Sequence, residues 1–136
     1  MADLRRVTDD FWVAPQLRPE DLASAREAGI RTVVCNRPEG EEPGQPATDS
    51  LEAAAAEAGL AFAAVPLTFP PSETAIEANA RVIAEAEGPV LAFCKSGTRS
   101  VAAWAIAEVL ANRRTPQQVV TLAGQAGYDI SRLFSA

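Results

Sequence analysis

The strongest constraint on the fold is an alternation of short apolar runs with longer helix-forming segments along the whole chain. The expected strands are 11–13, which we place at a sheet edge, 31–36, 61–67 and 90–93. The expected helices are 20–28, 49–59, 72–87, 98–112 and 115–127, with a short helical turn within 128–136. Strands that alternate with helices form right-handed crossovers, which produce a mostly parallel sheet covered on both faces. We therefore expect a single α/β domain over residues 1–136, with a four- to five-stranded sheet flanked by helices.

Cap signals and proline content set the boundaries of these segments. Asp49 or Ser50 is expected to cap the second helix, and Ser72 is expected to cap the third. Thr115 before a proline is typical of the start of the last long helix. The segment 37–48 contains three prolines and two glycines, so we expect a loop there.

The composition excludes several functional classes. The chain has no histidine, so a Cys-His or Ser-His-Asp mechanism within one chain is impossible, and the commonest metal ligand is missing. A net charge of -6 argues against a nucleic-acid surface. Two cysteines are too few for a disulfide framework or a zinc cluster, and no apolar run is long enough to span a membrane. We expect a cytoplasmic protein without a metal, a cofactor, a nucleic-acid partner or a membrane partner.

One segment carries the residue types of a reactive site. It follows the strand 90–93 and opens a helix, and it reads Cys94-Lys95-Ser96-Gly97-Thr98-Arg99-Ser100. Ligands of open α/β sheets bind beyond the carboxyl ends of the strands, which is where Cys94 lies. Backbone N–H groups of a glycine-containing turn and a helix N-terminus bind anions, and an arginine can add a forked contact. We predict an anion-binding loop over residues 94–100.

The same features act on the Cys94 thiol. A helix N-terminus and a neighbouring arginine lower a cysteine pKa from about 8.5 to between ~3.5 and 7.5, so a thiolate exists without a histidine partner. Thr98 or Ser100 could donate a hydrogen bond to the sulfur. Cys94 and Arg99 are therefore the predicted catalytic pair. The competing interpretation is a structural buried cysteine in a tight turn between strand and helix.

Further candidates follow the second strand, whose carboxyl end should lie at the same sheet edge as Cys94. Asn36 and Arg37 come directly after that strand, and Arg37 could bind an anionic substrate. Glu39 or Glu41 could orient Arg37 or Arg99. The alternative is a surface loop with ordinary ion pairs of little energetic value.

Three other residues leave two interpretations open. Cys35 is either a resolving thiol or a small buried core residue. Glu73 is either a proton donor near the site or an acidic residue in the first turn of a helix. Gln16 follows the first strand and can reach the site, although nothing in the sequence requires it.

The chain resembles a bacterial family, formerly a domain of unknown function, of beta-lactamase-hydrolase-like phosphatases or sulfur transferases. The matching segments are 13–16, 19–22, 29–33, 36–41, 43–46, 65–66 and 94–100. The resemblance implies a fold similar to that of protein tyrosine phosphatases and dual-specificity phosphatases. It also implies a link to sulfide oxidation and a possible sulfide-oxidation partner enzyme, because related domains are fused to persulfide dioxygenases. The predicted anion-binding loop itself favours a small anionic substrate, which is a persulfide, thiosulfate or a phosphoester.

The spacing within the loop separates the two activities that the family names suggest. Four residues lie between Cys94 and Arg99, as in rhodaneses, whereas tyrosine phosphatases have five. Position 93 is Phe rather than the usual His, and residues 66–80 contain no Asp to act as an acid. The leading hypothesis is therefore a sulfurtransferase that works through a Cys94 persulfide. The alternatives are a tyrosine-type phosphatase with a Cys94 phosphocysteine and a non-catalytic carrier of persulfide or anions.

Overall fold

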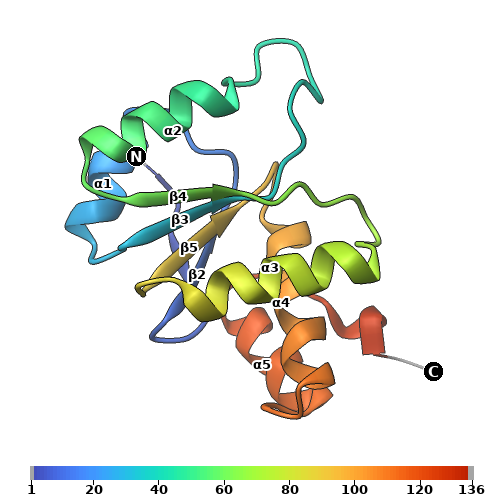
Figure 1. The fold of residues 1–136 in the computed structure, drawn as a ribbon. Helices are drawn as coiled ribbons and strands as arrows, with labels where there is room; N and C mark the ends of the chain where they lie inside the picture. The colour runs from blue at the N-terminus through green and yellow to red at the C-terminus, as the bar shows by residue number, and fades with distance from the viewer. Residues whose placement is uncertain (1, 135–136) are drawn as a thin grey trace.

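The computed structural model describes residues 2–134, which form an α/β domain around one five-stranded sheet of order β1-β2-β5-β3-β4 (Figure 1). The strands are β1 (Arg5–Arg6), β2 (Phe11–Ala14), β3 (Thr32–Cys35), β4 (Ala61–Ala64) and β5 (Val90–Phe93). Strands β2, β5, β3 and β4 are parallel, and β1 pairs antiparallel with β2. The predicted fold class, a mostly parallel sheet flanked by helices, is confirmed.

The sheet edges differ from the prediction. The segment 11–13 was expected at an edge, but β2 lies between β1 and β5. The covering strand β1 is two arginines long, so it has no apolar run that a sequence pattern could detect. The opposite edge is β4, where Ala61 and Ala64 are exposed.

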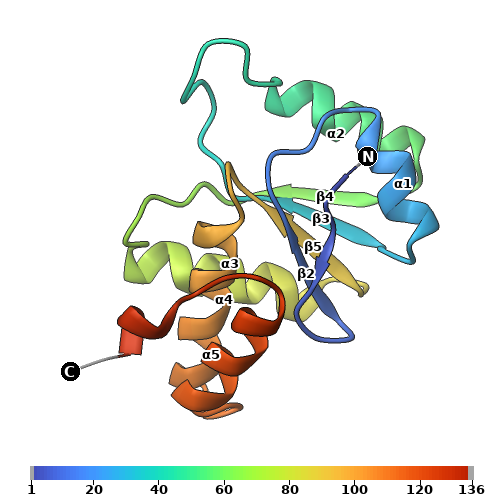
Figure 2. The ribbon, with the colours of Figure 1, turned by 180° about the vertical axis from the view of Figure 1, so that it is seen from behind.

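The helices form two layers, one on each face of the sheet (Figures 1 and 2). They are α1 (Asp21–Glu27), α2 (Thr48–Glu57), α3 (Glu73–Glu85), α4 (Thr98–Leu110) and α5 (Pro116–Gln125). Helices α1 and α2 cover one face, and α3, α4 and α5 cover the other. A 3-10 turn follows at Ser131–Phe134, within the expected range, and residues 135 and 136 lie outside the described residues.

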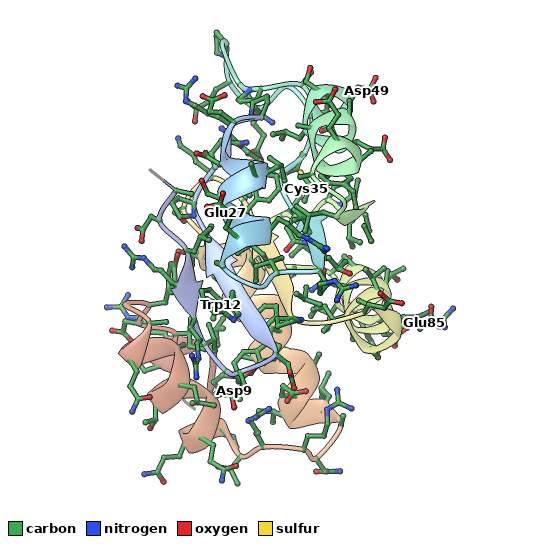
Figure 3. The ribbon with its side chains drawn as sticks, turned by 90° about the vertical axis from the view of Figure 1, so that its left-hand side faces the viewer. Asp9, Trp12, Glu27, Cys35, Asp49 and Glu85 are labelled. Carbon is green, nitrogen blue, oxygen red and sulfur yellow. The ribbon has the colours of Figure 1, made fainter. Side chains whose placement is uncertain are left out.

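The core follows from the twofold alternation of side chains along each strand. In β5, Leu91 and Phe93 pack toward α1 and α2, whereas Val90 and Ala92 pack toward α4 and α5. Cys35 belongs to the α1–α2 side (Figure 3). Each fully buried large apolar side chain contributes about 1.5–3 kcal/mol through its removal from water.

Helix caps agree with the sequence at two of three positions. The Ser72 hydroxyl accepts from the Ala75 N–H at 3.2 Å, and Thr115 forms a capping box at the start of α5. The predicted cap by Asp49 or Ser50 is wrong, because α2 begins at Thr48 after Ala47. Ala47 has no side-chain acceptor, so the carboxylate of Glu39 accepts from the Thr48 N–H instead.

The parallel strands bring four chain segments to one edge of the sheet. Gln16, Asn36, Val65 and Cys94 follow the carboxyl ends of β2, β3, β4 and β5. The arrowheads of these strands point toward the turn that starts α4 (Figure 1). This edge holds the predicted loop, as expected for an open α/β sheet.

None of the helices within residues 2–134 has the length and apolar character needed to cross a bilayer.

Candidate active site

Cys94 lies at the base of a turn between β5 and α4. Its side chain has no exposed surface, and its Sγ accepts a hydrogen bond from the Gly97 N–H at an N···S distance of 3.1 Å. The N-terminus of α4, a helix of 13 residues, begins immediately after this glycine. The Gly97 N–H and the N-terminal end of α4 therefore both lie beside Sγ.

The sulfur's hydrogen-bond donor differs from the predicted one. The Ser100 hydroxyl donates to Asn36 Oδ1 at 2.8 Å, so it does not donate to the sulfur. Thr98 Oγ1 accepts from the Ser96 hydroxyl at 3.0 Å. The backbone of Gly97, and neither predicted hydroxyl, makes the hydrogen bond to Sγ.

The turn at Gly97 is closely packed as well as unusual in its backbone. Its φ of +101° is a conformation that residues with a side chain rarely adopt. A Cβ at this position would lie 2.2 Å from Tyr128 Oη and 2.9 Å from Val13 Cγ1. Tyr128 Oη also donates to the Ser96 carbonyl at 3.0 Å, and burial raises the pKa of this phenol, which keeps it protonated as a donor.

Arg99 is held in a forked ion pair beside the thiol. Its Nη1 and Nη2 donate to the two carboxylate oxygens of Glu41 at 2.7 and 2.9 Å, and Nη1 also donates to the Leu67 carbonyl at 2.9 Å. These hydrogen bonds to Glu41 raise the pKa of Arg99, and the nearby Cys94 sulfur raises it further. In turn, the guanidinium of Arg99 lowers the pKa of Glu41 to about 2. The Arg99 fork is therefore charged and fixed in direction at neutral pH.

Arg37 anchors the loop after β3. Its Nε donates to Glu41 at 2.8 Å, and its Nη groups donate to Gln16 and Glu42, each at 3.0 Å. Glu42 also pairs with Lys95 of the turn. Because every nitrogen of this buried guanidinium has a partner, Arg37 orients Glu41 and Glu42 in this structure. Binding of substrate by Arg37 stays a prediction.

A second, fully buried polar network lies behind the turn. Asn36 accepts from Ser100 and donates through Nδ2 to the Val65 carbonyl and to Asn79 Oδ1, both at 2.9 Å. Asn79 Nδ2 has no partner among the described residues. This network ties the first turn of α4 to the ends of β3 and β4 and to α3. It gives Asn36 a positioning role.

The remaining candidates are divided by their contacts. The prediction was that Glu39 or Glu41 orients Arg37 or Arg99, and Glu41 accepts hydrogen bonds from both arginines. Glu39 caps α2 and contacts neither arginine, so that part of the prediction is wrong. Glu73 is exposed in the first turn of α3, and its side chain makes no hydrogen bond or ion pair within residues 2–134. Cys35 is a buried free thiol whose pKa is raised by burial, in agreement with the core interpretation.

Sequence reasoning missed Glu42, Tyr128 and Asn79, which the fold brings to the site or to the network behind it. Glu42 is one of several glutamates in the 37–48 loop, and its place in the chain does not distinguish it. Tyr128 follows the last long helix, where the chain carries no motif. Within residues 2–134, no three Cys, Asp or Glu side chains group in a way that could hold a metal ion.

Comparison with known proteins adds to this geometry. Residues 3–111 match the family model described as beta-lactamase hydrolase-like protein, phosphatase-like domain. The chain belongs to this family. A beta-lactamase hydrolase-like protein of Xylella fastidiosa is 38% identical over 127 residues, which cover 93% of this chain and 30% of that protein. The chain thus spans less than a third of the length of that curated relative.

Solved structures confirm the phosphatase-like fold of this family member. A crystal structure of a "putative phosphatase" from Neisseria meningitidis superposes with a TM-score of 0.87 at 28% identity, covering 96% of this chain and 93% of that one. TpbA of P. aeruginosa in complex with pTyr has a TM-score of 0.66 at 18% identity, covering 95% and 77% of the two chains. The predicted resemblance to tyrosine-phosphatase folds is confirmed by these similarities.

The Arg99–Glu41 pair leads to a first prediction. Replacing Glu41 with glutamine should lower kcat/KM about 10- to 100-fold, because a charge-assisted pair worth about 1.5–3 kcal/mol is lost. Glu39→Gln is the matched control, since Glu39 contacts no arginine, and it should keep full activity. Equal losses in the two variants would contradict the role of Glu41.

The same pair has a defined pH dependence. The folded-state pKa of Glu41, about 2, lies below its ordinary value of 4.5, so its stabilising contribution is complete above pH 4.5 and is lost as pH falls toward 2. The stability difference between the wild type and Glu41→Gln, measured by denaturant unfolding, should therefore be constant near neutral pH and shrink in that acidic window.

Proposed function

We propose that this domain is a cysteine-dependent phosphatase that acts on a small anionic phosphoryl substrate. The observation that carries the proposal is Cys94 Sγ, which accepts the Gly97 N–H and lies beside an Arg99 fork held by Glu41. The neighbour in complex with pTyr and the family's phosphatase-like description support this activity over sulfur transfer. The leading hypothesis from the loop spacing thus gives way to its first alternative.

The first chemical step is a displacement at phosphorus. The Cys94 thiolate forms an S–P bond while the bond from phosphorus to the leaving oxygen breaks, and the leaving oxygen departs with the electron pair. The phosphoryl oxygens are bound by the N–H groups of residues 95–99 and by Arg99, which offset the charge that they carry in the transition state. The product of this step is a phosphocysteine and the released leaving group.

The second step regenerates the enzyme. A water oxygen attacks phosphorus, the S–P bond breaks, and Cys94 leaves as a thiolate that the Gly97 N–H and the helix N-terminus stabilise. The water proton moves to an oxygen of the departing phosphate, so the step needs no histidine. A second step without a histidine is consistent with the sequence, which contains no histidine.

Sulfur transfer is the second candidate, favoured by the four-residue spacing between Cys94 and Arg99. Cys94 thiolate would attack the outer sulfur of a persulfide, releasing the donor thiolate and forming a Cys94 persulfide. An acceptor thiolate would then remove that sulfur. A sulfide-oxidation enzyme would be the natural partner for this activity. Thiolates are good leaving groups, so neither step needs an acid.

Mass spectrometry of the trapped intermediate distinguishes the two activities. The protein is mixed with an activated aryl phosphate or with glutathione persulfide, quenched in acid and mapped by peptide. We expect one phosphoryl group on the Cys94 peptide, together with catalytic release of phosphate. Loading of one sulfur on Cys94, discharged by a thiol and without any phosphate release, would replace the phosphatase by the sulfurtransferase.

A further inference from the structure

The two carboxylates near the turn, those of Glu41 and Glu42, are both paired with cations. Glu41 binds Arg99 and Arg37, and Glu42 binds Arg37 and Lys95. Each of these pairs favours the ionised carboxylate, and the pKa of each glutamate is lowered. A carboxylate that stays ionised at neutral pH cannot supply a proton to a leaving group.

The segment that borders Arg99 on the other side lacks a carboxyl group. The Leu67 carbonyl accepts from Arg99 Nη1, which places the following residues next to the turn. Residues 68–72 are Thr, Phe, Pro, Pro and Ser. The next acidic residue, Glu73, is exposed in α3, and its carboxylate makes no hydrogen bond or ion pair with another described residue.

The other protonated groups near the turn are also engaged. The Tyr128 O–H donates to the Ser96 carbonyl, and the Lys95 ammonium pairs with Glu42. The Ser100 O–H donates to Asn36. Near the turn, the structure therefore provides a candidate nucleophile and anion-binding groups, and the Tyr128, Lys95 and Ser100 donors each already have another acceptor.

We propose that the substrates of this domain are activated phosphoryl compounds, namely acyl phosphates and phosphoric anhydrides, whose leaving group departs as a stable anion without receiving a proton. This proposal rests on the proposed phosphatase function. A carboxylate or phosphate leaving group carries its negative charge in water at neutral pH. The alkoxide of serine or threonine does not, and the phenol of tyrosine, with a pKa of about 10, is intermediate. General acid catalysis raises a reaction rate by about 10²–10⁴-fold. Without an acid, we expect substrates with a poor leaving group to react more slowly by that factor.

The electron balance of the first step shows why the leaving group decides the rate. The Cys94 thiolate supplies the pair for the S–P bond, and the pair of the breaking P–O bond stays on the leaving oxygen. Without an acid, that oxygen bears the full negative charge, and its basicity enters directly into the barrier. The turn's N–H groups and Arg99 bind the phosphoryl oxygens, so they do not stabilise the negative charge that develops on the leaving oxygen.

The test is the dependence of rate on the leaving group. Phosphate release is measured for a series of aryl phosphates of graded phenol acidity, for acetyl phosphate and for a phosphoserine peptide. We expect kcat/KM to fall steeply, approaching about tenfold for each unit of leaving-group pKa, with acetyl phosphate among the best substrates. A shallow dependence, or hydrolysis of the phosphoserine peptide as fast as acetyl phosphate, would overturn the proposal.

A gain-of-function variant sharpens the test. Thr68 is exposed and follows Leu67, so Thr68→Asp adds a carboxyl group one residue from the carbonyl that binds Arg99. This variant should accelerate hydrolysis of the aryl phosphate with the least acidic phenol by about 10²-fold and flatten the dependence of rate on leaving-group pKa. Thr68→Asn, whose side chain has the shape of aspartate without its acid, should match the wild type. An unchanged steep dependence in Thr68→Asp would overturn the inference that the lack of a carboxyl group beside Arg99 sets the leaving-group dependence.

The outcomes also separate this proposal from the phosphatase function itself. If no substrate in the series yields phosphate or a phosphocysteine, the proposed function fails. If phosphate is released with a shallow dependence on the leaving group, the function stands and the substrate class proposed here is wrong.

Discussion

Replacing Cys94 with serine should lower kcat by at least about 10⁴-fold while leaving the fold intact. Serine fits the space of the thiol, and the Gly97 N–H that now donates to Sγ can donate to a hydroxyl. A serine hydroxyl is not ionised at neutral pH, and the chain has no histidine to remove its proton. The nucleophile is therefore lost and the packing is kept.

The other cysteine supplies the matched control for this experiment. Cys35 is also buried and free, but it packs on the α1–α2 side of the sheet. Burial raises the pKa of its thiol, which favours the protonated form. Cys35→Ser should keep the activity of the wild type and lose a modest amount of stability. Circular dichroism and denaturant unfolding check the fold of both variants. Activity retained in Cys94→Ser, or abolished only in Cys35→Ser, would disprove the assignment of the nucleophile.

Replacing Gly97 with alanine should be the most damaging single methyl addition in the turn. The positive φ of +101° costs about 1–2 kcal/mol for a residue with a Cβ. The new Cβ would also meet Tyr128 Oη at 2.2 Å and Val13 Cγ1 at 2.9 Å, and such overpacking adds about 1–3 kcal/mol. We expect unfolding at a clearly lower denaturant concentration and loss of most activity, because the Gly97 N–H moves away from Sγ.

A second glycine separates backbone strain from steric collision. Gly29 has a φ of +103°, and a Cβ there would meet nothing within 4 Å. Gly29→Ala should therefore lose only the backbone cost of about 1–2 kcal/mol and keep its activity. Equal destabilisation in the two variants would show that the contact of the turn with Tyr128 and Val13 has no energetic weight.

Much of the fold was predictable because its signals are local. The β-branched run in β3, the apolar run in β5 and the caps at Ser72 and Thr115 each lie within a few residues. Strand β1 escaped detection because two arginines have no hydrophobic pattern, and their pairing depends on β2 folding back beside them. The cap of α2 was mispredicted because its acceptor, Glu39, comes from the preceding loop and not from the helix start.

The sequence by itself placed Cys94 and the turn after it at the carboxyl edge of the sheet, and it predicted a nucleophile and an anion-binding turn there. These follow from contiguous residues, since a strand, a glycine turn and a helix start leave Cys94 few alternative surroundings. Only the tertiary structure decided that Glu41 and not Glu39 holds Arg99, 58 positions away, and that Tyr128 closes the space behind Gly97. Several glutamates and hydroxyl residues are chemically equivalent along the chain. Which of them meets the site depends on how distant segments pack, and short-range patterns carry no information about that packing.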